Sequence, residues 1–354
     1  MSQTETRSDE AMKGHEGVGG RAGALAKSRE FCRELTKREA RNFYYGLKLL
    51  PEPKRSAMYA LYGYMRLVDD IADDDGEGRS VEQRREELDR WEMMTQRVVA
   101  EAGGGMLSGH SDRLGESESP AAPLSMAHGS MTHTSGEPRQ DADATGLDAT
   151  AWVWPAFGEM VRRYRVPGKV FADMIAGQRQ DLEPVAIPNC AALHEYCYRV
   201  ASVVGVASLY VFGFTGGEET LKLGVDRGIA FQLTNILRDL REDAGPPRGR
   251  CYLPADEMGR FGVTAAALAR GEAERGFGEM MAFQIARARE FYARSAALES
   301  RVDADARPTL SAMTEIYRGI LERIARDPEA VLRGRVRLSA WAKLRIGWRA
   351  MRGK

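Results

Sequence analysis

The sequence predicts an all-α protein, and three observations support this prediction. Outside two polar segments, apolar residues recur every three or four positions, which is the spacing of amphipathic helices. No stretch shows the alternation of apolar and polar residues that is typical of a half-buried strand. Strands do not alternate with helices either, so a nucleotide-binding sheet is not expected. A single helical domain follows.

Seven stretches of helical length follow one another along the chain, and glycine or proline lies between several of them. Pro51 and Pro53 precede the first stretch, and Gly216 and Gly217 divide the fourth from the fifth. Both residue types interrupt helices, because glycine favours turns and proline lacks the amide hydrogen. The expected helices cover residues 54–73, 81–99, 154–181, 193–214, 218–242, 265–302 and 308–327.

Two polar segments lie outside this pattern. Residues 1–27 and 103–150 are rich in glycine, serine and charged residues and have no apolar period. Such segments bury too little surface to offset the entropy of ordering the chain. We therefore expect a disordered N-terminal tail over 1–27 and a disordered insertion over 103–150, within a domain that spans 28–332.

The overall composition excludes several functions. The 354 residues include 51 basic and 51 acidic side chains, so no net field attracts nucleic acid and no such partner is expected. The four cysteines lack a CxxC pair, which argues against a zinc site or a disulfide framework. The N-terminus lacks the apolar core of a secretory signal, and no stretch reaches about 18 uncharged apolar residues. We expect a cytoplasmic protein.

A first acidic cluster ends the first expected helix, in the sequence LYGYMRLVDDIADDDGEG. Asp69 and Asp73 are four residues apart and share one helical face, and Asp70 lies beside them. A helix C-terminus is the negative end of the helix dipole, so carboxylates there are unfavourable without a cation. Mg²⁺ suits them because it binds a few carboxylates and bridges to phosphate. The alternative is a solvated surface turn.

A second acidic cluster lies in FQLTNILRDLREDA, near the end of the fifth expected helix. Asn235, Asp239 and Asp243 form one helical stripe, and Gln232 lies about one turn earlier. Oxygen ligands spaced by single turns can form a second Mg²⁺ platform. Two platforms that face each other could hold one diphosphate between several Mg²⁺ ions.

Arginines accompany both clusters. Arg66 lies three residues before Asp69 on the same face, Arg238 lies within the second cluster, and Arg250 follows it. Arginine can bind phosphate oxygens through two parallel hydrogen bonds, so these side chains can neutralise a diphosphate. The alternative is ordinary pairing with neighbouring carboxylates.

Several ordered motifs carry a resemblance to a known family. They are NFYYGLKLLPEPKRSAMYALYGYMRLVDDIAD, GQRQDLE, EYCYRVASVVG and QLTNILRDLREDA followed by GRCYLP. With these motifs the chain resembles the squalene and phytoene synthases, which are head-to-head prenyl transferases. The resemblance implies an isoprenoid synthase fold, in which a single helical domain surrounds a central cavity between the two acidic clusters.

The resemblance also implies a reaction. Mg²⁺ held by both clusters draws diphosphate off one allylic substrate, the double bond of a second molecule attacks the cation, and proton loss closes a cyclopropane. An allylic cation survives where water is excluded and aromatic or apolar walls surround it. The implied cofactor is Mg²⁺, in several ions, and the implied partners are a prenyl diphosphate and enzymes that act on the product.

The family motifs, together with the search for aromatic walls, single out individual residues. The implied metal ligands are Asp69, Asp70, Asp73, Asn235, Asp239 and Asp243. The implied catalytic residues are Tyr62, Arg66 and Tyr196. The candidate substrate-binding residues are Phe43, Tyr45, Arg66, Gln232, Arg238, Arg250 and Tyr252. Without the family, a buried tyrosine such as Tyr196 would be interpreted as core packing.

The sequence FYYGLKLLPEPKR followed by VDDIAD resembles the bacterial hopanoid-pathway enzymes. This resemblance implies that two farnesyl diphosphates are condensed to presqualene diphosphate, and we expect no requirement for NADPH. The alternative is a phytoene synthase that acts on geranylgeranyl diphosphate, because one or two side chains can alter pocket depth. An alternative of another class is a helical binding or scaffold protein whose acidic turns are solvated or bind Ca²⁺.

Residues 333–354 form a basic amphipathic segment, with eight basic residues, no acidic one, and the tryptophans Trp341 and Trp348. Such a segment can lie on an anionic membrane as a peripheral contact at its inner face. The alternative is a last helix that packs its tryptophan side against the domain, while arginine and lysine face water or substrate phosphate.

Overall fold

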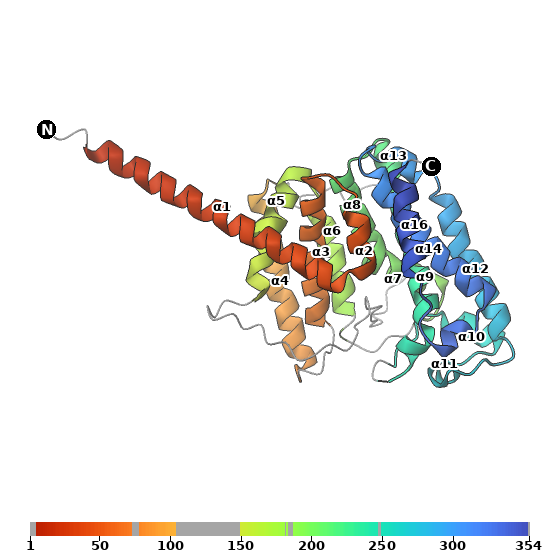
Figure 1. Ribbon diagram of the computed structural model, residues 1–354. Coiled ribbons are helices and arrows are strands. Elements are labelled where there is room, and N and C mark those ends of the chain that lie inside the picture. Colours follow the sequence, from red (N-terminus) through yellow and green to blue (C-terminus); the bar gives the residue numbers. More distant parts are fainter. Residues whose placement is uncertain are drawn as a thin grey trace.

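The protein is an assembly of helices. The computed structural model describes residues 5–72, 78–103, 149–180, 182, 187–246 and 249–352. Within these ranges no strand forms, and one isolated β-bridge pairs Phe214 with Val302. The helices pack against one another without a sheet (Figure 1). The expectation of an all-α protein is confirmed.

The first half of the fold gathers six helices around one apolar core. Tyr64 lies fully buried in this core, and its ring stacks on Phe157 with the centroids 4.1 Å apart. A reciprocal capping box between Ser80 and Gln83 starts the fourth helix, because each side chain binds the other residue's backbone amide. The helices are α1 (Glu5–Glu39), α2 (Arg41–Leu47), α3 (Lys54–Ala72), α4 (Val81–Glu101), α5 (Trp154–Tyr164) and α6 (Gly168–Gln180), with a 3₁₀ helix over Ala149–Val153.

The second half of the fold surrounds α9 (Gly217–Ala244), a helix of 28 residues. Leu233, Leu237 and Leu240 of α9 are buried in a second apolar core. A π-helical turn over Tyr198–Ser202 leads into α8. The other helices are α7 (Cys190–Cys197), α8 (Val203–Phe212), α10 (Ala255–Phe261), α11 (Ala265–Arg270), α12 (Phe277–Arg294), α13 (Leu298–Arg301), α14 (Arg307–Arg326), α15 (Ala330–Arg333) and α16 (Ala340–Met351).

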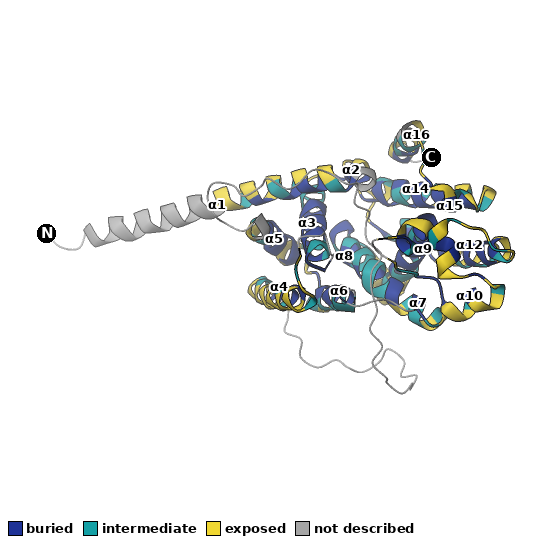
Figure 2. Cartoon of the chain, turned by 90° about the horizontal axis from the view of Figure 1, so that it is seen from below, coloured by how far each residue is buried: buried dark blue, intermediate teal, exposed yellow. Residues whose placement is uncertain are grey.

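The two cores meet along α8. Leu209 and Phe212 of this helix belong to the first core, while α8 also packs against α9 of the second half. Figure 2 shows α8 between the group formed by α4, α5 and α6 and the group that contains α9 and α12. Residues from both halves can therefore face a space beside α8.

Three of the expected helices are broken in the structure. The stretch 154–181 becomes α5 and α6, because Arg165 adopts a left-handed backbone with φ of 51° and Pro167 follows it. The stretch 193–214 contains the π-helical turn. The stretch 265–302 becomes α11, α12 and α13, and Gly271 ends α11 in the left-handed region at φ 73°. Apolar periodicity persists across such breaks and does not reveal them.

The boundary between the expected tail and the domain also differs from the structure. The helix α1 continues through residue 27 without a break. Leu25 and Phe31 both pack against the first core. The chain therefore joins the domain before residue 28, because apolar residues of α1 find buried partners there. The expected insertion over 103–150 lies, apart from its ends, outside the described residues.

Candidate active site

A cavity opens between the two halves of the fold. On α3 and α9, most polar lining residues lie toward the C-terminal part of the helix, apart from Arg227 nearer the start of α9, whereas α8, α13 and α14 add mainly apolar side chains. The polar lining includes Tyr62, Arg66, Asp69, Gln178, Gln232 and Asn235. The apolar lining includes Leu47, Met58, Leu209, Phe212, Leu298 and Leu310. The cavity thus joins a polar end to a long apolar end.

The first acidic cluster lies at the polar end, in the last turn of α3. The Arg66 guanidinium lies 2.6 Å from a carboxylate oxygen of Asp70 and 3.9 Å from one of Asp69. Gln178 of α6 donates a hydrogen bond to Asp69 Oδ1 at 2.8 Å. The sequence motif GQRQDLE contains Gln178, but sequence reasoning did not single it out. Asp73 lies outside the described residues.

Arginines neutralise the helix end that carries this cluster. Arg79 donates to the carbonyl oxygen of Asp70 at 2.9 Å, and Arg84 donates to that of Ala72 at 2.9 Å. Arg66 adds a third positive charge on the same helix. Protein cations therefore already oppose the negative end of the helix dipole. The helix dipole therefore does not by itself require a bound metal ion, and the oxygen ligands of the cluster are the reason to expect one.

The second acidic cluster follows one stripe of α9, as its spacing predicts. Gln232 and Asn235 line the cavity, and the Asn235 amide donates to Gln232 Oε1 at 3.2 Å. Asp239 and Asp243 are buried further along the helix, at 4% and 6% exposure. Arg238 donates to both carboxylate oxygens of Asp239, at 2.8 and 2.5 Å. The buried carboxylate of Asp239 is thus held by its neighbour in sequence.

Basic residues of the C-terminal segment reach this cluster. Arg335 Nε lies 3.2 Å from Asp239 Oδ1. Burial lowers the pKa of Arg335, and the charges of Arg238 and Arg337 lower it further, against the opposite effect of Asp239. Burial, Arg337 and Arg238 also lower the pKa of Lys343. Burial is the main cause of both lowered pKa values and neighbouring positive charge adds to it, so an added phosphate anion would find several cations here.

Tyr196 and Tyr252 form a stacked pair beside the second cluster. Their ring centroids are 5.1 Å apart at an interplanar angle of 16°. Tyr196 is 2% exposed, and its hydroxyl has no hydrogen-bond partner in the described part of the chain. Burial raises the pKa of Tyr196 well above its ordinary value, with smaller contributions from Tyr252 and Asp243. The phenol therefore stays protonated and can donate a hydrogen bond, although Tyr196 is not among the cavity-lining residues.

The loop after α9 folds back onto the same cluster. The backbone amide of Arg250 donates to the carbonyl oxygen of Asp243 at 2.7 Å. Tyr252 is buried at 2% exposure. Arg250 and Tyr252, which the sequence predicts to bind substrate, therefore lie beside Asp243 and Tyr196. Neither residue lines the cavity.

The remaining aromatic candidates differ in placement. Tyr62 lines the cavity one turn before Arg66, and burial raises its pKa, so its hydroxyl also stays protonated. Tyr45 is 67% exposed and does not line the cavity, because its neighbour Tyr44 takes the inward position on α2. The expectation that Tyr45 faces the substrate is not met. The side chain of Phe43 lies outside the described part of the structure.

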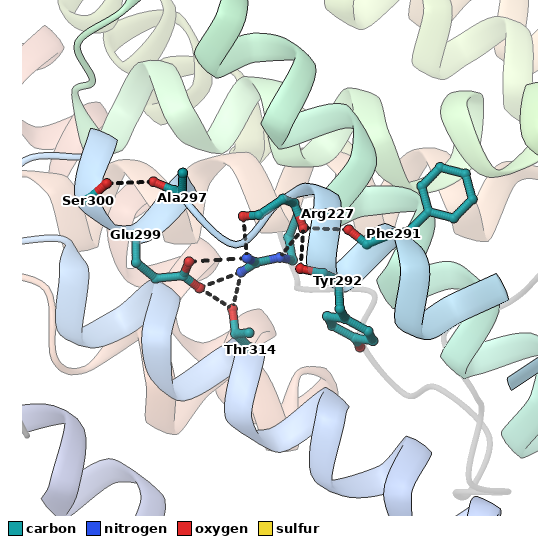
Figure 3. A network of polar contacts seen from close by, with 8 residues as sticks. Arg227, Phe291, Tyr292, Ala297, Glu299, Ser300 and Thr314 are labelled. Atoms are coloured by element: carbon teal, nitrogen blue, oxygen red, sulfur yellow. Dashed lines mark hydrogen bonds and ion pairs between the residues drawn. The ribbon is translucent and has the colours of Figure 1, made fainter. Parts of the chain in front are cut away.

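A buried arginine at the apolar end of the cavity is fully bonded within the protein (Figure 3). Arg227 of α9 donates twice to the carboxylate of Glu299, once to the hydroxyl of Thr314, and to the hydroxyl and carbonyl oxygens of Ser295 at 2.9 and 2.8 Å. These bonds use all five N–H donors of the guanidinium. Arg227 therefore ties α9 to α13 and α14 and is not a second diphosphate ligand.

The donor atoms at the polar end suit a hard divalent cation. Across the described residues, no three acidic, histidine or cysteine side chains converge on one point. The donors present are carboxylate and amide oxygens, the ligand type that Mg²⁺ prefers. The amide oxygens of Asn235 and Gln178 are buried, with no hydrogen-bond partner among the described residues. The residues therefore fit Mg²⁺ in company with a diphosphate, whose oxygens would complete the ligand set.

Comparisons with known proteins identify the family. The family model of squalene/phytoene synthase matches residues 36–342. The chain is 31% identical over 332 residues to 15-cis-phytoene synthase of Synechococcus elongatus, covering 91% of each chain. It is 32% identical over 329 residues to phytoene synthase of Arthrospira platensis, covering 90% of each chain. Both relatives thus match along almost their whole length.

Solved structures share the fold. A dehydrosqualene synthase bound to a ligand superposes with a TM-score of 0.71 at 22% identity, covering 94% of this chain and 98% of that one. Squalene synthase HpnC from Alicyclobacillus acidocaldarius superposes with a TM-score of 0.65 at 22% identity, covering 86% and 97%. The isoprenoid synthase fold implied by the sequence motifs is therefore present. On the family model and the full-length relatives, the chain belongs to the squalene/phytoene synthase family of prenyl transferases.

Proposed function

We propose that the protein joins two prenyl diphosphates head to head. One diphosphate and one proton leave, and the product is a cyclopropane that carries the second diphosphate. The cavity carries this proposal, because it places anion-binding groups at one end and apolar walls along the rest. A prenyl diphosphate has the same division, with a charged head on an apolar chain.

The polar end would hold the leaving diphosphate. Bound to Asp69, Asp70, Asn235, Asp239 and Asp243, with Asp73 added from the sequence pattern, Mg²⁺ would neutralise the departing charge. The arginines at both clusters would bind the remaining phosphate oxygens, and Gln178 holds Asp69 in place through its hydrogen bond. The chain's own residues thus supply orientation and positive charge to a leaving group that cannot depart as a bare anion.

The apolar end would protect the allylic cation. Side chains such as Leu209, Phe212 and Leu310 exclude water, which would otherwise capture the cation. Phe231 and Tyr317, which stack with centroids 4.4 Å apart, present aromatic rings at the cavity wall. Aromatic faces stabilise a nearby positive charge without reacting with it.

The buried tyrosines would act as hydrogen-bond donors. Burial keeps the hydroxyls of Tyr62 and Tyr196 protonated, so neither can serve as a phenolate base near neutral pH. Tyr62 can donate to a group inside the cavity that it lines. Proton removal then requires another acceptor, and the departed diphosphate, held at the polar end of the same cavity, would supply one.

Two substrates are supported by different observations. Geranylgeranyl diphosphate is our first candidate, because the full-length relatives of 31% and 32% identity are named phytoene synthases. Farnesyl diphosphate is the second candidate, since the sequence around VDDIAD resembles the hopanoid-pathway enzymes. Both candidates use the same chemistry and differ in how much of the apolar end the chain fills.

The experiment offers the purified protein each diphosphate separately, with Mg²⁺ and with or without NADPH, and identifies the products by mass spectrometry. We expect diphosphate release and a head-to-head product with geranylgeranyl diphosphate, independent of NADPH. A product from farnesyl diphosphate alone would transfer the assignment to the second candidate.

Two controls separate catalysis from binding. Chelation of Mg²⁺ by EDTA should stop diphosphate release, and the Asp69→Asn variant should lack turnover although it still binds prenyl diphosphate. A protein that releases diphosphate with neither substrate would overturn the proposal and favour a helical binding or scaffold protein.

A further inference from the structure

The last helix, α16, exposes its tryptophans. Trp341 is 83% exposed and Trp348 is 50% exposed, whereas Ile346 and Ala350 on the opposite face are buried at 8% each. The buried face packs against α14, and Figure 2 shows α16 on the outer side of that helix. The alternative in which the helix packs its tryptophan side against the domain is therefore wrong. The domain holds α16 in place while its aromatic face points away.

Basic side chains share the exposed face. Trp341, Arg345, Trp348 and Arg352 follow one another at helical spacing, so they form a single stripe. The Arg352 guanidinium lies 3.5 Å from the centroid of the Trp348 ring. Arg349 flanks the stripe and lies 4.0 Å from Glu315 of α14. The sequence from residue 333 to the end contains no acidic residue, so positive charge dominates this surface.

We propose that this stripe, named here the Trp–Arg face, docks the enzyme on an anionic lipid surface. Tryptophan favours the boundary between water and lipid, because its ring is apolar while its N–H can bond to a headgroup. Arginine binds the phosphates of anionic lipids and can extend its charged end toward them. A lone helix lying along the outside of the domain is convex, which matches a flat bilayer better than a groove that receives a peptide.

The mode of attachment is peripheral. In the described part of the chain, no helix has the length and apolar character needed to cross a bilayer. The face offers two tryptophan side chains and Met351 for shallow insertion, and its charges add to that contact. Attachment of this kind is reversible and weakens as salt screens the charges.

Docking through α16 would bring one wall of the cavity close to the bilayer. The outer side of α14 packs against α16. The inner side of α14 contributes Leu310, Met313 and Tyr317 to the cavity wall. An apolar product could then leave toward lipid instead of water. The release of product toward lipid rests on the proposed function, whereas the docking of α16 on a lipid surface does not.

The test measures sedimentation of the full-length protein with vesicles of phosphatidylcholine alone or mixed with phosphatidylglycerol, without substrate. We expect binding to the anionic vesicles that falls as salt is added. The variant Trp341→Ala/Trp348→Ala should bind at least tenfold more weakly. The variant Arg345→Gln/Arg349→Gln/Arg352→Gln should lose on the order of a hundredfold, because each basic residue near an anionic surface contributes roughly fivefold.

Matched controls come from α4, which is exposed on one side. Met93→Ala/Met94→Ala removes exposed apolar groups, and Arg85→Gln/Arg90→Gln/Arg97→Gln removes the same charge, and both should bind like the wild type. Unchanged melting temperatures show that the variants fold. Should one α16 variant fail to fold, the other still decides the question.

Three results would overturn the proposal. One is wild-type binding by a folded α16 variant, and another is equal binding to neutral and anionic vesicles. The third is loss of self-association in the tryptophan variant with unchanged vesicle binding, which would assign the face to a second copy of the chain. None of these results bears on prenyl transfer, because substrate is absent from the assay.

Discussion

Asp239 balances the charge of two arginines at the second acidic cluster, and we expect activity to depend on it. It is 4% exposed and faces two guanidinium groups, those of Arg238 and Arg335. In Asp239→Asn, both arginines lose a buried counter-charge, and we expect the free energy of unfolding to fall by about 3 kcal/mol. Turnover should fall roughly a hundred- to a thousandfold, since a proposed ligand of the Mg²⁺ that would neutralise the leaving charge is lost. Urea unfolding and steady-state kinetics measure the two effects.

The matched variant is Asp70→Asn at the first cluster. Its partner Arg66 keeps a second carboxylate, Asp69, at 3.9 Å. We expect a comparable loss of turnover with a smaller loss of stability. Wild-type turnover in either variant would contradict the assignment of two platforms to one diphosphate.

Gln178 is a positioning residue, because its amide donates to Asp69 while its own oxygen has no partner among the described residues. In Gln178→Leu, Asp69 loses this hydrogen bond and its fixed orientation. We expect the Mg²⁺ concentration for half-maximal turnover to rise roughly tenfold, with little change in maximal turnover. Gln180→Leu, two residues along the same helix, is the control. Equal Mg²⁺ dependence in the wild type and Gln178→Leu would show that the hydrogen bond is structural only.

The sequence predicts which candidate site residues share one helical face. Asn235, Asp239 and Asp243 share one stripe because helical spacing is encoded locally, and Arg66 accompanies Asp69 for the same reason. The sequence did not predict roles for Gln178 and Arg335, because each contacts a carboxylate that lies far away along the chain. Tyr45 was placed in the cavity because the sequence does not tell which side of a short helix faces inward.

The helices α9, α13 and α14 are joined by the Arg227 network, which gives this part of the fold a pH dependence. Burial acts to raise the pKa of Glu299, but hydrogen bonds and charge from Arg227 outweigh it, so the pKa lies below the ordinary value of 4.5. The stability that this carboxylate contributes is present above the unfolded pKa and is lost as pH falls through the lower, folded pKa.

The variant Glu299→Gln tests how much the charge of Glu299 contributes to the stability of the Arg227 network. Near neutral pH we expect it to be less stable than the wild type by about 2 kcal/mol, because charged hydrogen bonds to Arg227 are lost. Below the ordinary pKa of 4.5 the difference should shrink, since acid protonates Glu299 in the wild type. Urea unfolding across this range measures it. A difference that stays constant with pH would mean that the pKa of Glu299 is the same in the folded and the unfolded state, so that the Arg227 network does not lower it.

Helix content was predictable from apolar spacing, whereas helix ends were only partly so. Proline and glycine marked the start of α3 and the break before α9, because both act on the local backbone. Pro167 and Gly168 are a local signal for the break after Arg165, although the apolar spacing continues across it, whereas the π-helical turn before α8 has no such signal. Tertiary packing can override local preference at such a turn, and a single segment does not encode it.

At the scale of the whole molecule, the C-terminal segment returns to the second acidic cluster on α9. The segment after α15 brings Arg335 to Asp239, and α16 then covers the outer side of α14. The C-terminal segment therefore adds Arg335 to the second acidic cluster and also presents the Trp–Arg face. Removing the segment would disturb both, so truncation cannot test membrane docking by itself.

Truncation does test whether the segment completes the site. A chain ending at Gly334 lacks Arg335 and exposes the surface that Ile346 and Ala350 bury. We expect its free energy of unfolding to fall by about 3 kcal/mol, from the apolar area returned to water. Turnover should fall at least tenfold, because Asp239 loses one of its two arginines and an anion loses a binding partner.

The point variant Arg335→Gln separates the two effects of the truncation. It keeps α16 on α14 and removes one charge from the second cluster. We expect turnover to fall as in the truncated chain, while stability stays close to that of the wild type, because Arg238 still holds both oxygens of Asp239. Turnover assays with soluble substrate and urea unfolding distinguish the outcomes. If the truncated chain is inactive but Arg335→Gln is fully active, the segment acts through packing alone, and the crowded positive charge at Asp239 plays no part in binding diphosphate.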